Sequence, residues 1–183
     1  MFPDDDHNNR SIWRAYLPHA RCVLESRLVD QGQQSRMRLL WRYATCLFAD
    51  GRWYEAEAAF VEGFEIEKRE LGADHPDTLT SMANLASTYR NQGRWDDAEK
   101  LEVQVMETRK TKLGLDHLDT LTSMADLAFT WKRSGKETEA VRLMEECVQL
   151  RKRILGPDHT DSISSYTALD IWKADLEDVI LAI

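Results

Sequence analysis

Cysteine is scarce in this sequence, and long apolar segments are missing. The three cysteines, Cys22, Cys46 and Cys147, are odd in number, lack CxxC spacing and lie in apolar periodic stretches. We therefore expect buried, reduced thiols of an intracellular protein. No apolar run approaches the roughly 20 residues that span a bilayer. The N-terminal segment 1–6, with three aspartates, lacks the basic-then-apolar order of a secretory signal. These absences predict a cytoplasmic protein with no membrane partner.

Local signatures of catalysis and of ion binding are also missing. No serine lies in a GxSxG sequence, no cysteine and histidine share a recognised catalytic signature, and no GxxxxGKS/T phosphate loop is present. The Asp-rich turns lack the calcium-loop pattern of alternating ligands, glycine and terminal glutamate. We predict no catalytic residue, no cofactor and no metal site.

The composition is that of a folded domain. The 183 residues, with 43% hydrophobic content, are enough for one sizeable core and fit one domain better than two. Charged residues make up 31% of the chain, with a net charge of -8. This charge argues against nonspecific binding to nucleic acid.

An internal repeat with a period of 42 residues determines the expected architecture. Residues 71–112 and 113–154 align without a gap, residues 29–70 form a diverged copy, and a further copy begins at Leu155. We predict one domain over residues 1–183, with an N-terminal capping helix in 9–28, repeats at 29–70, 71–112 and 113–154, and a partial repeat with a C-terminal cap in 155–183.

Each copy contains two apolar stripes at helical spacing. Met82, Leu85, Ala86 and Tyr89 follow the i, i+3, i+4, i+7 pattern of one helix face, and residues 124–131 repeat it. A second stripe follows a glycine turn, where a positive φ often ends a helix. The Trp95-Asp96 pair resembles a propeller signature, but a helix-forming sequence follows it. The sequence therefore predicts an all-α fold of helix pairs.

The turn between copies has the repeated sequence Asp-His-x-Asp. We expect Asp77, Asp119 and Asp161 to cap the helices that follow, with Pro76 suited to the first turn. The three histidines of these turns recur one repeat apart, roughly 10 Å at helix-packing distances. That spacing is too large for a shared metal, whose ligands lie about 2 Å from it.

The order of bulky residue, Leu, small residue and aromatic, then Gly93 and Ala98, resembles the tetratricopeptide repeat. The 42-residue period with the sequence LGADHPDT is similar to the kinesin light chain subtype, and TLTSMANLASTYRNQGRW is similar to the C-terminal repeats of fungal NB-ARC or NACHT receptors. The resemblance covers residues 35–173. It implies antiparallel helix pairs stacked in a right-handed superhelix, whose inner surface is lined by the first helix of each pair.

Several residues depart from the family pattern. Glu102 occupies a slot that is usually apolar or aromatic, and Asp170 and Lys173 replace a small and an aromatic residue of the earlier copies. Such changes are typical of the end of an array. Leu176, Val179, Ile180 and Ile183 form one stripe that we expect on a short covering helix. A terminal helix is expected to cover the array at each end. The N-terminal helix would do so through its apolar residues: Trp13, Leu17, Ala20, Val23 and Leu24.

The resemblance also implies a binding surface on the positions outside the packing stripe. Arginine and asparagine there supply several fixed hydrogen-bond donors, and Phe129 adds an apolar anchor. The predicted partner-binding residues are Arg38, Arg42, Asn84, Ser87, Arg90, Asn91, Asp126, Phe129, Lys132 and Arg133. The six tryptophans are expected to be mostly structural.

The predicted function is a non-catalytic interaction module that binds a peptide or partner helix, with an acidic peptide favoured by the basic inner residues. One alternative is an enzyme or small-molecule binder that uses Asp126, Arg90 and Lys132 in a closed concave pocket. Another is self-association through the terminal helices, as a homodimer or as a sensor or scaffold fragment of a fungal receptor. A buried carboxylate with a shifted pKa in a deep pocket would favour the enzyme.

Overall fold

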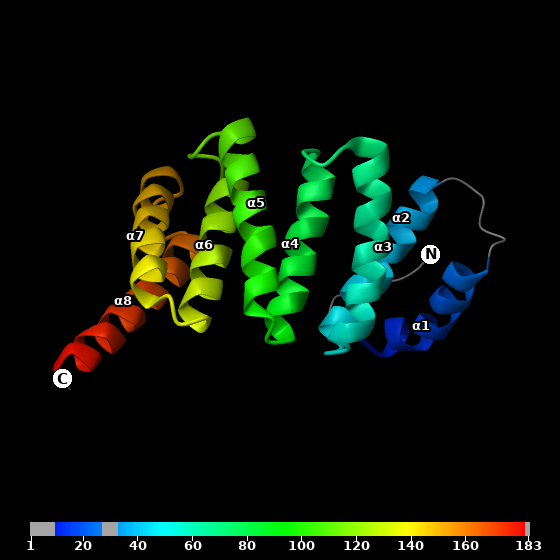
Figure 1. Cartoon of the computed structure of the whole chain (residues 1–183), viewed down its shortest axis with the longest axis horizontal. Helices are drawn as coiled ribbons and strands as arrows, with labels where there is room; N and C mark the ends of the chain where they lie inside the picture. Colours follow the sequence, from blue (N-terminus) through cyan, green and yellow to red (C-terminus); the bar gives the residue numbers. More distant parts are fainter. Residues whose placement is uncertain (1–9, 27–32, 182–183) are drawn as a thin grey trace. The chain divides into compact units, whose positions relative to one another are not determined.

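The computed structural model describes residues 10–26 and 33–181, which are helical almost throughout (Figure 1). No strand occurs among these described residues. The helices are α1 (Arg10–Glu25), α2 (Gln33–Ala49), α3 (Trp53–Leu71), α4 (Pro76–Asn91), α5 (Trp95–Leu113), α6 (Leu118–Arg133), α7 (Glu137–Ile154) and α8 (Thr160–Leu181).

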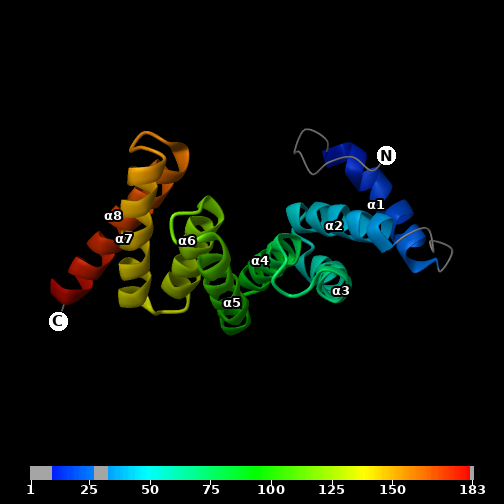
Figure 2. The same cartoon turned by 90° about the horizontal axis from the view of Figure 1, so that it is seen from above.

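The chain divides into two compact units, residues 1–94 and 95–183. The first contains α1 to α4 and the second α5 to α8, and within each unit every helix packs against the next one along the chain (Figures 1 and 2). Short turns join these neighbours, so that consecutive helices are antiparallel. The all-α class and the helix-pair architecture are confirmed, whereas a single domain over residues 1–183 stays a prediction.

The predicted apolar stripes form the core of each unit. In α4 the side chains of Met82 and Leu85 are buried and Ala86 is fully buried, and Ala128 takes the same position in α6. A methyl side chain at this position lets the paired helix approach closely, and any larger side chain would have to displace it. The 42-residue repeat therefore has a direct structural counterpart in both units.

A glycine ends α4 as the sequence predicted. Gly93 has a φ of +77°, its N–H donates to the Arg90 carbonyl at 3.0 Å, and the Arg94 N–H donates to the Tyr89 carbonyl at 2.9 Å. This pair of hydrogen bonds is the Schellman motif, which satisfies carbonyls that have no partner inside the helix. Only glycine adopts such a φ without a Cβ penalty.

The capping residues at the helix starts differ from those predicted. The N-cap of α4 is His75, whose Nδ1 accepts from the Asp77 backbone N–H at 3.2 Å, and His117 and His159 make the same bond to the N–H two residues on. The aspartates lie two residues too late to cap, and their own N–H groups are the ones that need an acceptor. As negative charges in the first turn, they instead complement the helix dipole. The interpretation of Pro76 is confirmed at the first helical position.

The N-terminal helix is held to the first unit by apolar and ionic contacts. Trp13, Leu17 and Ala20 are buried as predicted, and the guanidinium groups of Arg10 and Arg14 both bond to the Asp50 carboxylate. Burial alone would raise the pKa of Asp50, but the hydrogen bonds from Arg14 and Arg10 outweigh it and hold that pKa below its ordinary value.

Two expectations for α1 were wrong. Val23 is exposed rather than packed, at the edge of the buried stripe of Trp13, Leu17 and Ala20. Cys22 is also exposed, because it lies on the opposite side of α1 from that stripe. Cys46 and Cys147 are buried free thiols, as predicted. Burial raises the pKa of Cys147 to about 11, so this thiol stays protonated.

The C-terminal covering helix is not a separate element. α8 continues without a break from Thr160 to Leu181 and includes the partial repeat, because no glycine interrupts the sequence there. The side chains of Val179, Ile180 and Ile183 lie outside the described residues, so their predicted stripe stays a prediction. Asp170 is exposed at the position where Ala86 and Ala128 are fully buried.

Candidate functional site

Helices α2, α3 and α4 of the first unit enclose a groove of about 770 Å³, called here the Glu67 groove. Two of the predicted binding residues, Arg38 and Arg42, line it from α2. The lining residues are Gln34, Met37, Arg38, Leu39, Trp41, Arg42, Glu67, Asp77, Thr80 and Ser81.

A second groove of about 780 Å³ follows along the same helices, called here the Asn84 groove. It brings together all four predicted residues of α4. Its lining residues are Trp41, Thr45, Phe48, Ala49, Gly51, Trp53, Phe60, Asn84, Ser87, Arg90 and Asn91. Trp41 belongs to both grooves, so the two adjoin at this side chain.

The polar groups of the Asn84 groove are partly preorganised. Arg90 donates to the Ser87 hydroxyl at 3.0 Å, and the Asn91 amide donates to the Ser87 carbonyl at 2.8 Å. Within the part of the chain that the structure describes, the Asn84 side-chain amide makes no hydrogen bond. A half-buried amide with a free donor and a free acceptor can pair with both polar groups of a peptide backbone.

Trp41 is a site residue that the sequence interpretation missed. Its side chain is 40% exposed, although the other large apolar side chains described in α2 are buried or half-buried. A large, rigid aromatic ring at the junction of two grooves is the type of residue that anchors protein interfaces. The signal that could have identified it is its position in the same helical face as Arg38 and Arg42.

Glu67 is the second missed residue. Only 8% of it is exposed, and Ser81 hydrogen-bonds to its carboxylate, but its Oε2 atom is buried with no hydrogen-bond partner. Burial is the main cause that raises the pKa of Glu67, the Ser81 bond lowers it, and the charge of Asp77 raises it further. The groove wall therefore contains a carboxylate that the protein itself satisfies only in part.

The predicted residues of the second unit have a different environment. The ammonium group of Lys132 bonds to Glu137 at 3.3 Å and to Asp175 of α8 at 3.1 Å, and only 15% of its side chain is exposed. Burial alone would lower the pKa of Lys132, but the hydrogen bonds to Asp175 and Glu137 outweigh it and raise that pKa. The expectation of a cation open to a ligand is not supported at Lys132, because neighbouring carboxylates already engage it.

The other predicted residues of α6 are also partly engaged. The Phe129 ring meets the Trp172 ring of α8 edge to face, with centroids 5.0 Å apart, and Phe129 keeps 39% exposure. Asp126 is half-buried and Arg133 is exposed. These residues share one helix face with Lys132, and none of them lines the Glu67 groove or the Asn84 groove.

Ion binding and membrane insertion find no support in the described ranges. Within residues 10–26 and 33–181, no three metal-binding side chains lie close enough together to hold an ion. The three repeat histidines act as helix caps instead. None of the helices described is both long and apolar enough to cross a bilayer.

Comparison with known sequences identifies the repeat. Sequence models of the tetratricopeptide repeat family match residues 35–111 and, separately, residues 120–161. The chain is a tetratricopeptide repeat protein. The matches cover helix pairs of both units, which agrees with the 42-residue repeat period and with the positions of the turns in the sequence.

Solved structures with the same fold include kinesin light chain-like repeats. A putative kinesin light chain protein with nearly identical TPR-like repeats from Podosopora anserina aligns over 93% of this chain and 86% of its own, at 22% identity, with a TM-score of 0.76. BtubC (BKLC) from P. vanneervenii aligns over 94% of this chain and 67% of its own, at 19% identity and a TM-score of 0.69. At these identities the likeness shows the fold alone.

One relative by sequence is a much longer protein than this chain. A nucleotide-binding leucine-rich repeat (NLR)-like protein from Hyaloscypha variabilis is 39% identical over 83 residues, which are 45% of this chain. The chain matches 8% of that relative's length. The resemblance to kinesin light chain-like repeats and to a fungal NLR-like protein is thereby confirmed.

Proposed function

We propose that this tetratricopeptide repeat protein binds a segment of another protein in the Glu67 and Asn84 grooves, without catalysis. The observation that carries the proposal is the convergence of six predicted residues on two adjoining grooves, with the exposed Trp41 between them. Tetratricopeptide repeats are typically protein-interaction folds, which supports the general class.

The chemistry of the two grooves fits an extended peptide. Asn84 supplies a backbone-pairing amide, Trp41 supplies the apolar anchor, and Arg38 and Arg42 supply positive charge for acidic side chains. Binding through a few such anchors gives modest affinity unless the ligand is preorganised. An acidic ligand segment is part of this proposal.

A peptide selection tests the proposal. Random peptides displayed on phage would be selected on immobilised protein, and enriched peptides measured by fluorescence polarisation against wild type, Trp41→Ala and Asn84→Ala. We expect each variant to weaken binding about tenfold or more, the size of an anchor-residue effect. Lys100→Ala is the matched control, because Lys100 is a highly exposed lysine of α5 outside both grooves. Enriched peptides that bind all the variants equally would contradict the proposal.

A small-molecule or enzyme function is the second candidate, and Glu67 is the observation in its favour. A buried carboxylate with a raised pKa beside a groove is what a general acid or base requires. The positions equivalent to Glu67 in the next two copies hold Arg109 and Arg151, so those copies lack the carboxylate that such a function would use.

The remaining parts of the proposal concern context. A cytoplasmic location fits the free thiols, and self-association through terminal helices fits the exposure of Ile12 in α1 and Ile171 in α8. If the chain acts within a larger receptor like its NLR-like relative, these repeats would be the part that senses a partner.

A further inference from the structure

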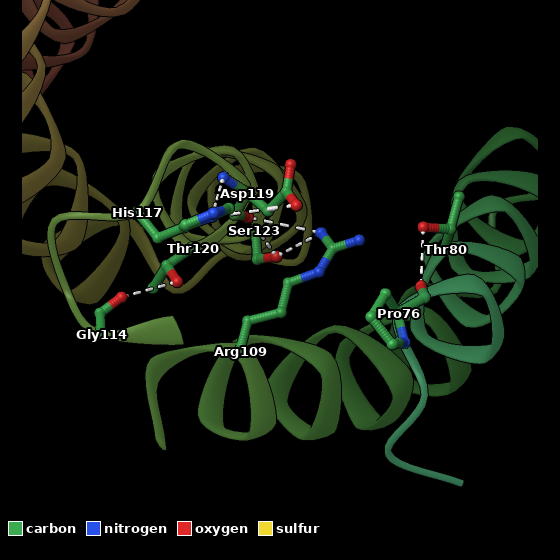
Figure 3. A network of polar contacts seen from close by, with 8 residues as sticks. All are labelled: Pro76, Thr80, Arg109, Gly114, His117, Asp119, Thr120 and Ser123. Carbon is green, nitrogen blue, oxygen red and sulfur yellow. Dashed lines mark hydrogen bonds and ion pairs between the residues drawn. The ribbon is translucent and has the colours of Figure 1, made fainter. Parts of the chain in front are cut away.

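A buried polar contact recurs between consecutive repeats. Arg109 of α5 extends to the start of α6, where its guanidinium donates to the Ser123 hydroxyl at 2.9 Å and to the Asp119 carbonyl at 3.3 Å (Figure 3). One repeat later Arg151 donates to the Ser165 hydroxyl at 2.6 Å and to the Asp161 carbonyl at 3.1 Å. The Ser hydroxyl and Asp carbonyl thus form a receptor for a guanidinium group in both copies.

The first copy keeps the receptor but lacks its arginine. Ser81 and Asp77 hold the equivalent positions at the start of α4, whereas the arginine position of α3 is Glu67. A carboxylate cannot donate to the Asp77 carbonyl, and it leaves its own Oε2 buried without a hydrogen bond. A buried polar atom without a hydrogen bond costs folding free energy. A ligand donor that pairs with it recovers this free energy on binding.

The same three residues line the Glu67 groove. Glu67, Asp77 and Ser81 are all among its lining side chains, and the groove is large enough for a side chain from a ligand. We propose that the Glu67 groove binds an arginine side chain of the partner peptide, which supplies in trans the guanidinium that Arg109 and Arg151 supply in cis. This inference rests on the proposed function, because it assigns a ligand residue to one of the two grooves.

The neighbouring groups determine how the arginine is held. The planar guanidinium has several N–H donors in fixed directions, so one N–H points toward the Glu67 carboxylate and another toward the Ser81 hydroxyl. A lysine ammonium is a compact charge without this fixed pair of donors. Trp41 and Met37 line the same groove, and the Trp41 ring offers a face for the planar group.

Charges of both signs surround this arginine site. Asp77 adds attraction, whereas Arg38 and Arg42 on α2 oppose it. Arg38 is exposed, so solvent screens its charge, whereas Arg42 is half-buried and is screened less. Arg38 and Arg42 are then placed for acidic residues that flank the ligand arginine.

A titration with a single blocked amino acid tests the inference directly. N-acetyl-arginine amide would be added to ¹⁵N-labelled protein while the Trp41 indole N–H signal is followed by NMR, after assignment with Trp41→Phe. We expect a saturable shift in the millimolar range, as suits one side chain. N-acetyl-citrulline amide has the same shape without the charge and is expected to bind at least about tenfold more weakly, the loss typical of a charged hydrogen-bond partner.

Two variants at Glu67 separate the arginine site from a general effect on folding. Glu67→Gln removes the charge, and Glu67→Arg recreates the contact seen at Arg109, so both are expected to stay folded by circular dichroism. The arginine-dependent shift should disappear in both. An equal shift with citrulline, or an unchanged shift in Glu67→Arg, would overturn the inference.

The selected peptides distinguish failure of the inference from failure of the proposed function. If peptides bind in a Trp41-dependent way but an arginine-to-citrulline change weakens binding equally in wild type and Glu67→Gln, only the arginine site is wrong. If no peptide depends on Trp41 while N-acetyl-arginine amide still binds, the groove takes an arginine and the proposed function is wrong.

Discussion

In both units the predicted binding residues lie on the first helix of a pair, but their surroundings differ. In the first unit, the face formed by α2 and α4 leaves two grooves, with Trp41 exposed between them. In the second unit, Lys132 of α6 is held by Glu137 and Asp175, and Phe129 packs against Trp172 of the following helix. Repeat register therefore predicts where a side chain lies, while the residues of the neighbouring helix decide whether it is free to bind.

A second contrast concerns the contact between consecutive repeats. The second unit completes it twice with an arginine, at Arg109 and Arg151, and the first unit replaces the arginine by Glu67. In one form of the repeat contact an arginine makes the hydrogen bonds. In the other form a glutamate leaves one carboxylate oxygen without a hydrogen bond.

Charge in the tight helix contact is expected to have the largest effect. Ala86→Asp and Ala128→Asp each place a carboxylate where the alanine is fully buried, and should cost about 3 kcal/mol or more of unfolding free energy. Asp170→Ala, at the exposed equivalent position of α8, should change it by less than about 0.5 kcal/mol. Urea denaturation measures all three, and wild-type stability of Ala86→Asp would refute the register.

Removing the arginine from the completed contact is expected to come next. Arg109→Met keeps the buried stem but loses the charged hydrogen bonds to Ser123 and Asp119, at a cost of about 1.5–3 kcal/mol. Glu67→Arg should instead raise stability, because it completes the same contact in the first unit. Both changes are measured by urea denaturation, and a destabilised Glu67→Arg would show that the first unit cannot accommodate the second unit's contact.

Replacing Glu67 by glutamine should stabilise the protein at neutral pH by the order of 1 kcal/mol, the effect of relieving a poorly paired buried group. Because burial raises the folded-state pKa of Glu67, the folded wild type binds a proton more readily than the unfolded chain does. Wild-type stability from this group therefore falls as pH rises from the unfolded pKa through the folded one.

The pH dependence provides the check on this explanation. The melting-temperature difference between Glu67→Gln and wild type should be largest above the folded pKa of Glu67 and should shrink as the pH is lowered toward about 4, the ordinary range of a glutamate. A difference that stays constant from pH 8 to about 4 would exclude the carboxylate charge as its cause.

The histidine caps should contribute similarly in both units. His75→Ala and His117→Ala each remove the acceptor of one backbone N–H, at a cost of about 1 kcal/mol, whereas asparagine at either position should be nearly neutral. The melting temperatures of the alanine and asparagine variants at each position measure these costs. Equal costs for alanine and asparagine would mean that the histidine rings contribute through packing rather than through the cap.

Much of the fold could be predicted from the sequence because it depends on local and periodic signals. The apolar stripe through Met82, Leu85 and Ala86 and the positive φ at Gly93 followed directly from spacing and from glycine chemistry. The cap was assigned to the wrong residue, because Asp77 is the more common capping type and the ring nitrogen of His75 is an unusual acceptor.

The site was only partly predictable. Asn84, Ser87, Arg90 and Asn91 line one groove as a group, since neighbouring positions on a helix face stay together in any packing. The pairing of Lys132 depends on Asp175, which is 43 residues away in sequence and which spacing alone could not place opposite it. Glu67 was visible in principle, as the one acidic residue in a column otherwise occupied by arginine.

Two aromatic side chains with nearly equal exposure allow a direct test of which unit binds the peptide. Trp41 is 40% exposed in the first unit and Phe129 is 39% exposed in the second. For peptides selected on the wild-type protein, Trp41→Ala should weaken binding about tenfold or more, and Phe129→Ala less than about twofold, because only Trp41 lies in the grooves. Equal losses, or a larger loss at Phe129, would contradict the proposal that the grooves of the first unit bind the peptide.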